Sequence, residues 1–382
     1  MIQIQTVIIT VMEVVINNPS VIDTITSKIN TKTTLIENGR YYICGNIEVD
    51  NDLIIKPGVE IIMCSATRLK TTANGSINAI GSASNPIIIK GEQNMPGYWD
   101  LIDFNSNNPN NILKHVIISD GGYSNNYYNA TVWINDNYNG QLSISHTTIK
   151  NSKGPGLYME NGARFEGFSN NTFEKNNVPV VIPFANIGQL DEASNYGTTN
   201  TNNYIKVYNA ALNGDATVAA TNVPYYIEGR SEIKTGLKLN PGVKFLMGSD
   251  ARMSTTANGY FNAIGTADKP IIITGKEEVP GYWEFININS NNPNNKMEYV
   301  ELSYGGSSSN YKHSSIWVND NNNGQLTVNN CTFKKSYSWA IYVEQATIYP
   351  SDYAAINASN TFIDNGAGAN ANCTDNCSVY FQ

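Results

Sequence analysis

Short apolar runs of three to eight residues recur along the whole chain, and Gly, Asn, Asp and Pro separate them. Runs of this length are typical of β-strands, and the residues between them are those that turn a chain. Helical periodicity is nearly absent, and only residues 20–29 fit a short helix, which we expect to cap the fold. We expect strands over residues 53–56, 87–90, 113–119, 142–149, 157–160 and 172–174.

The chain contains an internal duplication. Residues 41–43, Tyr-Tyr-Ile, recur as residues 225–227, an offset of 184 positions. The same offset carries Asn-Ser-Asn-Asn-Pro-Asn-Asn from residues 105–111 onto residues 289–295. The match runs without a gap from about residue 41 to about residue 163, with roughly half of the positions identical. A tandem duplication therefore organises the molecule.

The segment between the copies is rich in Asn, Thr and Ala, but it contains strand-like runs at residues 182–184 and 204–207. We therefore expect the fold to continue through it. The predicted organisation is an N-terminal cap and first coil (1–40), copy one (41–175), continuing junction coils (176–224), copy two (225–366) and a C-terminal tail (367–382).

Many short strands suit a β-sandwich, a propeller or a solenoid. Closely spaced strands joined by two-residue Asn-Gly hairpins, which sandwiches use, are few here. Coils joined by bends of variable length explain how two copies keep a long gapless match while the coils within a copy differ. Asn side chains stacked at the bends would also explain the composition. We predict an all-β solenoid, a parallel β-helix built from a tandem duplication, with a pair of β-sandwiches as the alternative.

Four strings of copy one resemble the right-handed parallel β-helix proteins of the pectin-lyase-like superfamily. They are Asn-Ala-Ile-Gly (78–81), Asn-Pro-Ile-Ile-Ile (85–89), Gly-Tyr-Trp (97–99) and Val-Ile-Ile-Ser-Asp-Gly-Gly (116–122). The chain looks most like the exported or surface β-helix proteins of Bacteroidota-type bacteria. The resemblance implies a right-handed coil and a secreted or cell-surface location, but it fixes no activity.

Composition narrows the range of partners. Only 15% of residues are charged, the net charge is −8, and about one residue in seven is Asn. No basic cluster is present, so we expect no nucleic-acid partner. No apolar run approaches the roughly 18 residues of a membrane span. Residues 1–16 are rich in Ile and Val but lack Lys and Arg, so no export signal is visible in them.

Five cysteines divide into two groups. Cys373 and Cys377 lie close together in a tail rich in Gly, Ala and Asn, and we expect them to form a small disulfide. Cys44, Cys64 and Cys331 lie in apolar strand-like segments, where we expect buried free thiols.

Catalytic patterns are scarce. In the superfamily that the chain resembles, polygalacturonase-like hydrolases carry the strings Asn-Thr-Asp, Asp-Asp, Gly-His-Gly and Arg-Ile-Lys. None of these strings occurs in this chain. His115, His146 and His313 are isolated, and we expect Arg68 and Arg252 to pack or pair along the stack. Three acidic positions match between the copies, and carboxylates about 5–10 Å apart would suit glycoside hydrolysis. These pairs are Asp100 with Glu284, Asp136 with Asp320, and Glu160 with Glu344, and solvated surface carboxylates are the simpler interpretation.

One repeated Asn-rich run is a candidate metal site. Alternating oxygen donors followed by Gly imitate the first half of a calcium loop, although the bidentate Glu of such a loop is missing. A plain Asn-rich turn is the alternative. The candidate calcium ligands are Asn135, Asp136, Asn137 and Asn139 in copy one, and Asn319, Asp320, Asn321 and Asn323 in copy two.

Tyrosine is abundant, with 23 residues, and many of them lie beside Asn, Ser and Gly in expected loops. Aromatic faces pack on sugar rings while amides and hydroxyls meet sugar hydroxyls. Trp99 and Trp283 follow Pro-Gly turns and are expected as core anchors. The candidate carbohydrate-binding residues are Tyr123, Tyr127, Tyr128, Tyr304 and Tyr311.

These features favour a non-catalytic secreted or cell-surface protein that binds a carbohydrate or cell-surface polymer, or that acts in adhesion. Two alternatives stay open. One is a polysaccharide lyase or glycoside hydrolase with an unfamiliar site, and the other is a structural segment of a larger surface or tail-like assembly.

Overall fold

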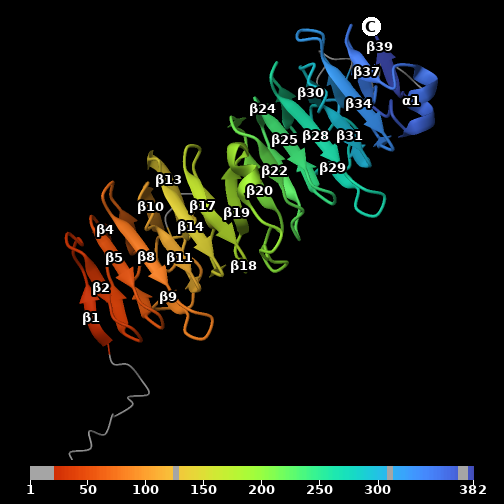
Figure 1. Cartoon of the computed structure of the whole chain (residues 1–382). Coiled ribbons are helices and arrows are strands. Elements are labelled where there is room, and N and C mark those ends of the chain that lie inside the picture. Colours follow the sequence, from red (N-terminus) through yellow and green to blue (C-terminus); the bar gives the residue numbers. More distant parts are fainter. Residues whose placement is uncertain (1–20, 124–128, 308–312, 369–376) are drawn as a thin grey trace, which may run out of the picture.

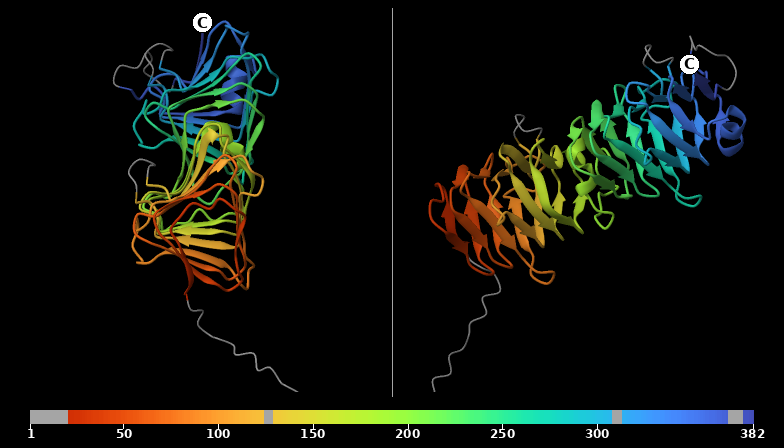
Figure 2. Two further views of the ribbon diagram at one scale, coloured as in Figure 1. Left: turned by 90° about the vertical axis from the view of Figure 1, so that its left-hand side faces the viewer. Right: turned by 45° about the horizontal axis from the view of Figure 1, so that its top comes forward.

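The computed structural model describes residues 21–123, 129–307, 313–368 and 377–382. Its strands are short and parallel, and they stack coil upon coil into a rod that encloses a continuous hydrophobic core (Figures 1 and 2). The chain is therefore a right-handed parallel β-helix, which confirms the predicted all-β solenoid.

Three sheets form the walls of the first half. In order along the rod, sheet A contains β1 (Val21–Ile25), β3 (Arg40–Ile43), β6 (Glu60–Met63), β9 (Ile87–Gly91), β12 (Val116–Ser119), β15 (Thr148–Lys150) and β18 (Thr172–Glu174). Sheet C contains β2 (Thr33–Leu35), β5 (Asp52–Ile55), β8 (Ser76–Ile80), β11 (Ile112–Lys114), β14 (Gln141–Ser145) and β17 (Arg164–Ser169).

Sheet B is the longest and runs through both halves. Its first part contains β4 (Asn46–Val49), β7 (Arg68–Thr71), β10 (Ile102–Ser106), β13 (Val132–Tyr138), β16 (Pro155–Met159) and β19 (Val178–Pro183). It continues with β20 (Ile205–Tyr208), β23 (Tyr225–Glu228), β26 (Lys244–Met247), β29 (Ile271–Gly275), β32 (Val300–Ser303), β35 (Thr332–Lys334) and β38 (Thr361–Ile363).

Two further sheets complete the second half. Sheet E contains β21 (Ala211–Leu212), β24 (Arg230–Ile233), β27 (Arg252–Thr255), β30 (Ile286–Ile288), β33 (Ile316–Val318), β36 (Ile341–Val343) and β39 (Val379–Phe381). Sheet F contains β22 (Ala216–Val218), β25 (Gly236–Leu239), β28 (Tyr260–Ile264), β31 (Lys296–Glu298), β34 (Gln325–Asn329) and β37 (Thr347–Tyr349). The 3-10 helix η2 (Phe184–Gln189) and the helix α1 (Tyr353–Ser359) lie between strands.

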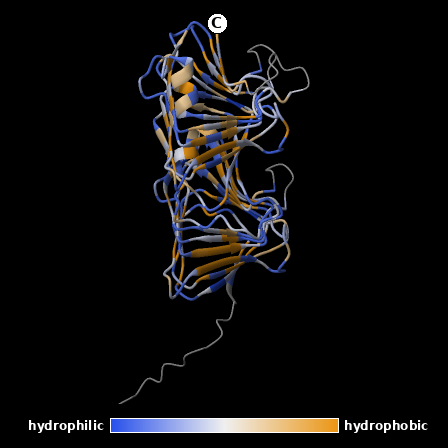
Figure 3. Ribbon diagram, turned by 90° about the vertical axis from the view of Figure 1, so that its right-hand side faces the viewer, coloured by the Kyte–Doolittle hydropathy of each residue, from blue (hydrophilic) through white to orange (hydrophobic). Residues whose placement is uncertain are grey.

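Alternate residues of most strands point into the rod. In β5, Leu53 and Ile55 are buried while Ile54 is half-buried on the outside. Hydrophobic residues follow the strands and hydrophilic residues gather at the bends (Figure 3). Side-chain alternation with a period of two explains why many strands read as apolar with polar interruptions.

Three expected elements differ from the structure. Residues 20–29 were expected as a helix, but β1 forms there and pairs in parallel with β3. Its β-branched residues suit a strand, and stacking satisfies its backbone groups. The runs 113–119 and 142–149 each divide into two strands, because His115 (φ 50°) and His146 (φ 51°) adopt left-handed backbone and turn the chain from sheet C to sheet A.

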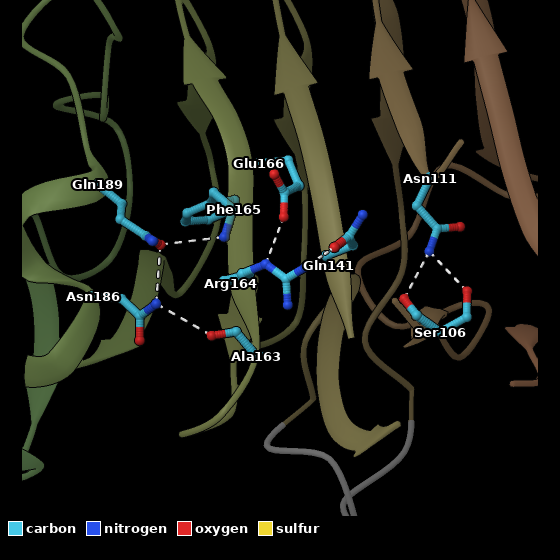
Figure 4. A network of polar contacts seen from close by, with 9 residues as sticks. All are labelled: Ser106, Asn111, Gln141, Ala163, Arg164, Phe165, Glu166, Asn186 and Gln189. Atoms are coloured by element: carbon cyan, nitrogen blue, oxygen red, sulfur yellow. Dashed lines mark hydrogen bonds and ion pairs between the residues drawn. The ribbon is translucent and has the colours of Figure 1, made fainter. Parts of the chain in front are cut away.

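Asparagine side chains hold the bends. Asn111 donates from its amide to the carbonyl and hydroxyl oxygens of Ser106 at 3.0 and 2.9 Å, and its own oxygen accepts from the Ile77 N–H at 3.1 Å (Figure 4). Asn176 accepts from the Ser152 N–H at 3.0 Å and donates its own N–H to Asn200 at 2.9 Å. Asn ladders along the stack therefore satisfy buried backbone groups.

The copies are offset by one sheet. Strand β3 of copy one belongs to sheet A, but its equivalent β23 belongs to sheet B. The segment between the copies therefore shifts the order of the sheets by one, so that a strand position in sheet A of copy one lies in sheet B in copy two. In Figure 1 the equivalent strands β10 and β30 both lie along the upper-left side of the rod, and β9 and β29 both lie along its lower-right side.

The cysteines correct one prediction. Cys44 and Cys64, expected as free thiols, form a disulfide with their Cα atoms 4.9 Å apart. Each residue directly follows one of the paired strands β3 and β6, so parallel stacking brings them together. Cys331 is buried and free as predicted. Cys377 is disulfide-bonded, and its predicted partner Cys373 lies outside the described residues.

Candidate functional site

The tyrosines predicted to bind sugars do not form a described cluster. Tyr123 is 53% exposed after Gly122, whereas Tyr304 is half-buried and packs against the core. Tyr127, Tyr128 and Tyr311 lie outside the described residues. The predicted loop site therefore stays a prediction.

The Asn-rich run of the predicted calcium site ends strand β13 in copy one and forms a turn over residues 320–323 in copy two. The Asn135 side-chain oxygen accepts the Asn137 N–H at 3.0 Å, and the Asn319 oxygen accepts the Asn321 N–H at 2.7 Å. Asn139 and Asn323 adopt left-handed backbone. Among the described residues, no three His, Cys, Asp or Glu side chains gather as a metal site. Calcium binding by Asn135, Asp136, Asn137 and Asn139, or by Asn319, Asp320, Asn321 and Asn323, stays a prediction.

Arginines pair with acidic residues along the stack, as predicted. Arg68 donates to Asp100 Oδ2 at 2.6 Å, and Asp100 is 5% exposed. In copy two, Glu284 forms ion pairs with Arg230 at 2.5 Å and with Arg252 at 3.7 Å. Asp100 and Glu284 are both buried ion-pair partners, so the expectation of solvated surface carboxylates is wrong for this pair. Trp99 and Trp283 are fully buried core anchors, which confirms that prediction.

The outer face of sheet B brings aromatic residues together. The paired strands place Trp133 of β13 beside Tyr158 of β16, with ring centroids 4.6 Å apart. Tyr158 stacks with Tyr208 of β20 at 6.1 Å and 9°. Leu101, Ala130, Val178 and Val181 complete this outer apolar cluster. A hydrophobic cluster outside the core marks this face as different from an ordinary solvated sheet face.

A hollow of about 420 Å³ opens on this face. We call it the tyrosine hollow. Its lining consists of Pro155, Tyr158, Asn177, Val178, Val181, Lys206, Tyr208, Asn209 and Glu228. Aromatic and aliphatic side chains lie beside amides and a paired Lys and Glu, and this mixture is typical of sites that bind small polar molecules.

Polar contacts fix the walls of the tyrosine hollow. The Tyr208 hydroxyl donates to the Met159 carbonyl at 3.0 Å, so the ring lies back toward the preceding coils. Lys206 Nζ and Glu228 Oε2 are 2.9 Å apart, and their side chains are 34% and 40% exposed. These two charged groups therefore remain accessible to a ligand.

Acidic residues lie near the Trp133 end of the outer face. Asp103, directly opposite Trp133 in the sheet, is 1% exposed. Its carboxylate oxygens have no hydrogen-bond partner of normal geometry, although the nearby Asn135 side chain favours the charged form. Burial raises the pKa of Asp103 to about 7, although the charges of Lys70 and Arg68 oppose the shift. Burial also raises the pKa of Glu160, and the adjacent carboxyl of Asp136 adds to the rise.

Sequence reasoning missed the tyrosine hollow because it sought tyrosines in loops. The signal was present in the strand-like run at residues 204–207. Ile205 and Val207 point into the core, so period-two alternation places Tyr204, Lys206 and Tyr208 together on the outer face. Which strands neighbour β20 could not be derived from the sequence.

Comparisons of the chain with protein-family models, with curated proteins and with solved structures find no match. Within the described residues, no helix is long and apolar enough to cross a membrane.

Proposed function

We propose that this chain is a non-catalytic β-helix protein that binds carbohydrate at the tyrosine hollow. The observation that supports the proposal is the pair of near-parallel rings of Tyr158 and Tyr208 beside the Lys206–Glu228 ion pair and two Asn amides. Aromatic rings contact the apolar faces of sugars, and the polar groups exchange hydrogen bonds with sugar hydroxyls.

A secreted or cell-surface location, with a role in adhesion, is part of the same proposal. The Cys44–Cys64 disulfide supports it, because disulfides persist in oxidising compartments. Membership of the pectin-lyase-like superfamily, with a likeness to the exported or surface β-helix proteins of Bacteroidota-type bacteria, is also part of this proposal.

The enzyme alternative has less support. Retaining and inverting glycosidases separate their two carboxyl groups by about 5–10 Å, whereas Glu160 Oε2 accepts the Asp136 N–H at 3.0 Å, so these two acidic residues are direct neighbours. Following reducing ends and unsaturated products over a panel of polysaccharides tests it.

Binding to a glycan array tests the main proposal. We expect Tyr208→Ala and Tyr158→Ala to weaken retention of any bound glycan by about tenfold or more, as loss of an aromatic contact worth 1–2 kcal/mol requires. Tyr123→Ala is the matched control, since this exposed tyrosine belongs to the loop site predicted from sequence. Binding lost in Tyr123→Ala and kept in Tyr208→Ala would move the site to the loop. No retention of any glycan would remove the proposal.

A further inference from the structure

The tyrosine hollow is elongated along the rod. Its lining residues come from four successive strands of sheet B: Tyr158 from β16, Val181 from β19, Tyr208 from β20 and Glu228 from β23. Neighbouring strands are about 4.8 Å apart, so these residues span about 14 Å along the stack. A ligand that uses the whole lining must lie across the strands, parallel to the rod.

The hollow carries no net charge. Its only charged lining groups are Lys206 and Glu228, which neutralise each other at 2.9 Å. The remaining polar side chains, Asn177 and Asn209, carry no charge. A carboxylate or sulfate group on a ligand would meet an ammonium that is already paired, and it would be repelled by Glu228 beside it.

Among the described residues, the cations beside the lining already have partners. Arg230, which borders Asn209, pairs with Glu284 at 2.5 Å. Lys276 lies over the rings of Tyr226 and Tyr204, with Nζ 4.7 and 5.5 Å from the centroids, so this ammonium is held by the aromatic faces next to the hollow. The chain as a whole carries a charge of −8, which adds repulsion toward a polyanion.

We propose that the ligand of the tyrosine hollow is an uncharged linear glycan that lies along the rod. This inference rests on the proposed carbohydrate-binding function and adds the class of glycan. The vicinal hydroxyls of a neutral sugar can accept from Lys206 and donate to Glu228 without either charge losing its partner.

Polymers that share a backbone and differ in charge test the inference. Suitable probes are dextran with carboxymethyl-dextran, and fully methyl-esterified polygalacturonan with its de-esterified form, together with neutral xylan and glucomannan. We expect any polymer retained to be neutral, with its charged counterpart bound about tenfold or more weakly. Retention should not change between low and high salt, because no charge is neutralised on binding. Affinity should rise with oligosaccharide length and level off once the chain spans the hollow.

Glu228→Gln sharpens the test, since it leaves Lys206 unpaired in the hollow. We expect this variant to gain affinity for the charged polymers by about tenfold, in a salt-dependent way, while neutral polymers change little. The matched control is Glu301→Gln, which unpairs Lys334 from a partner at 3.1 Å elsewhere on sheet B and should change neither class. Tighter binding of a charged polymer by the unmodified protein would overturn the inference and leave carbohydrate binding standing. Failure to retain any polymer would overturn both.

Discussion

Copy one and copy two share their bends and tryptophan anchors, and they differ most in chemistry on their outer surface. Trp99 donates its indole N–H to the Ser119 carbonyl at 2.7 Å, and Trp283 makes the same bond to Ser303 at 2.8 Å. Asn295 repeats the contacts of Asn111 with an adjacent serine. Both copies retain these anchor and bend residues, which the coils above and below hold in place. Most inward positions stay apolar but change in size, as from Ile61 to Phe245 and from Phe104 to Ile288.

Outward positions have diverged. Asp103 of copy one is replaced by Asn287 in copy two, and the disulfide residue Cys44 by Glu228, which lines the tyrosine hollow. Both copies keep a row of outer aromatic rings. Tyr158 stacks on Tyr208 at 6.1 Å and lines the tyrosine hollow, whereas its equivalent Tyr342 stacks on Tyr380 of β39 at 5.3 Å. The duplication thus supplies a common scaffold, and the charged and aromatic groups that distinguish the copies lie mainly where side chains face outward.

The largest expected effect tests the equivalence of the interiors. Trp99→Ala and Trp283→Ala each remove a fully buried indole, so each should lower the free energy of unfolding by about 3–5 kcal/mol. Denaturant unfolding followed by circular dichroism measures both variants. A loss that is large in one copy and small in the other would show that the two interiors are not energetically equivalent.

The disulfide gives the next largest effect, and it belongs to copy one alone. Replacing Cys44 and Cys64 with Ser opens a cross-link between residues 20 positions apart, which should cost about 3 kcal/mol. Thermal unfolding of the variant, and of the unmodified protein with and without a thiol reductant, measures the effect. Reductant should lower the melting temperature of the unmodified protein by more than that of the variant, which keeps the disulfide of Cys377. Equal sensitivity of the two proteins would locate the stabilising cross-link elsewhere.

Asp103→Asn copies the residue of copy two into copy one and should stabilise the protein above neutral pH. The folded-state pKa of Asp103 is raised from 3.8 to about 7, so the folded protein binds more protons than the unfolded chain between these values. Stability from Asp103 is therefore present below about pH 4, is lost as the pH rises toward 7, and stays lost above it. The full shift would be worth about 4 kcal/mol, and we expect about 2 kcal/mol because buried sites relax.

Unfolding midpoints between pH 4 and pH 8, bracketing the two pKa values, measure this effect. The difference between Asp103→Asn and the unmodified protein should grow with pH and then level off. The reciprocal variant, Asn287→Asp, should destabilise copy two at neutral pH. A difference that does not depend on pH would show that Asp103 is ionised at all these pH values.

Much of the fold could be predicted from the sequence, because each sequence signal for a strand or bend occurs in both copies of the repeat. The 184-residue offset, the Asn-rich bends and the apolar strand runs predict the β-helix, and Trp99 and Trp283 were recognised as core anchors. The corners at His115 and His146 were not, because a left-handed residue within an apolar run leaves no signature of its own. The Cys44–Cys64 bond was missed because register between coils is a long-range property.

The candidate site was harder to predict from the sequence, because it also depends on the register between coils. Tyr158 and Tyr208 are far apart in sequence and meet only because β16, β19 and β20 are consecutive in sheet B. No local sequence pattern predicts this order of strands, because the segment between the copies does not follow the 184-residue repeat. The loop tyrosines, such as Tyr123, were predicted instead because the composition of a loop can be read from neighbouring residues. The register between coils cannot be read in this way.

The smallest expected effect on stability comes from two surface ion pairs, and only one of them is expected to affect glycan binding. Lys206–Glu228 and Lys334–Glu301 are ion pairs of similar length and exposure on sheet B, the first in the tyrosine hollow and the second in copy two. Removing either pair with Lys→Met and Glu→Gln substitutions should change the free energy of unfolding by less than about 1 kcal/mol, because solvent screens both. Glycan retention should nevertheless fall only when the Lys206–Glu228 pair is removed. Because the two double variants perturb the fold equally, a loss of retention in both, or in neither, would show that the charged pair of the hollow does not contact the ligand.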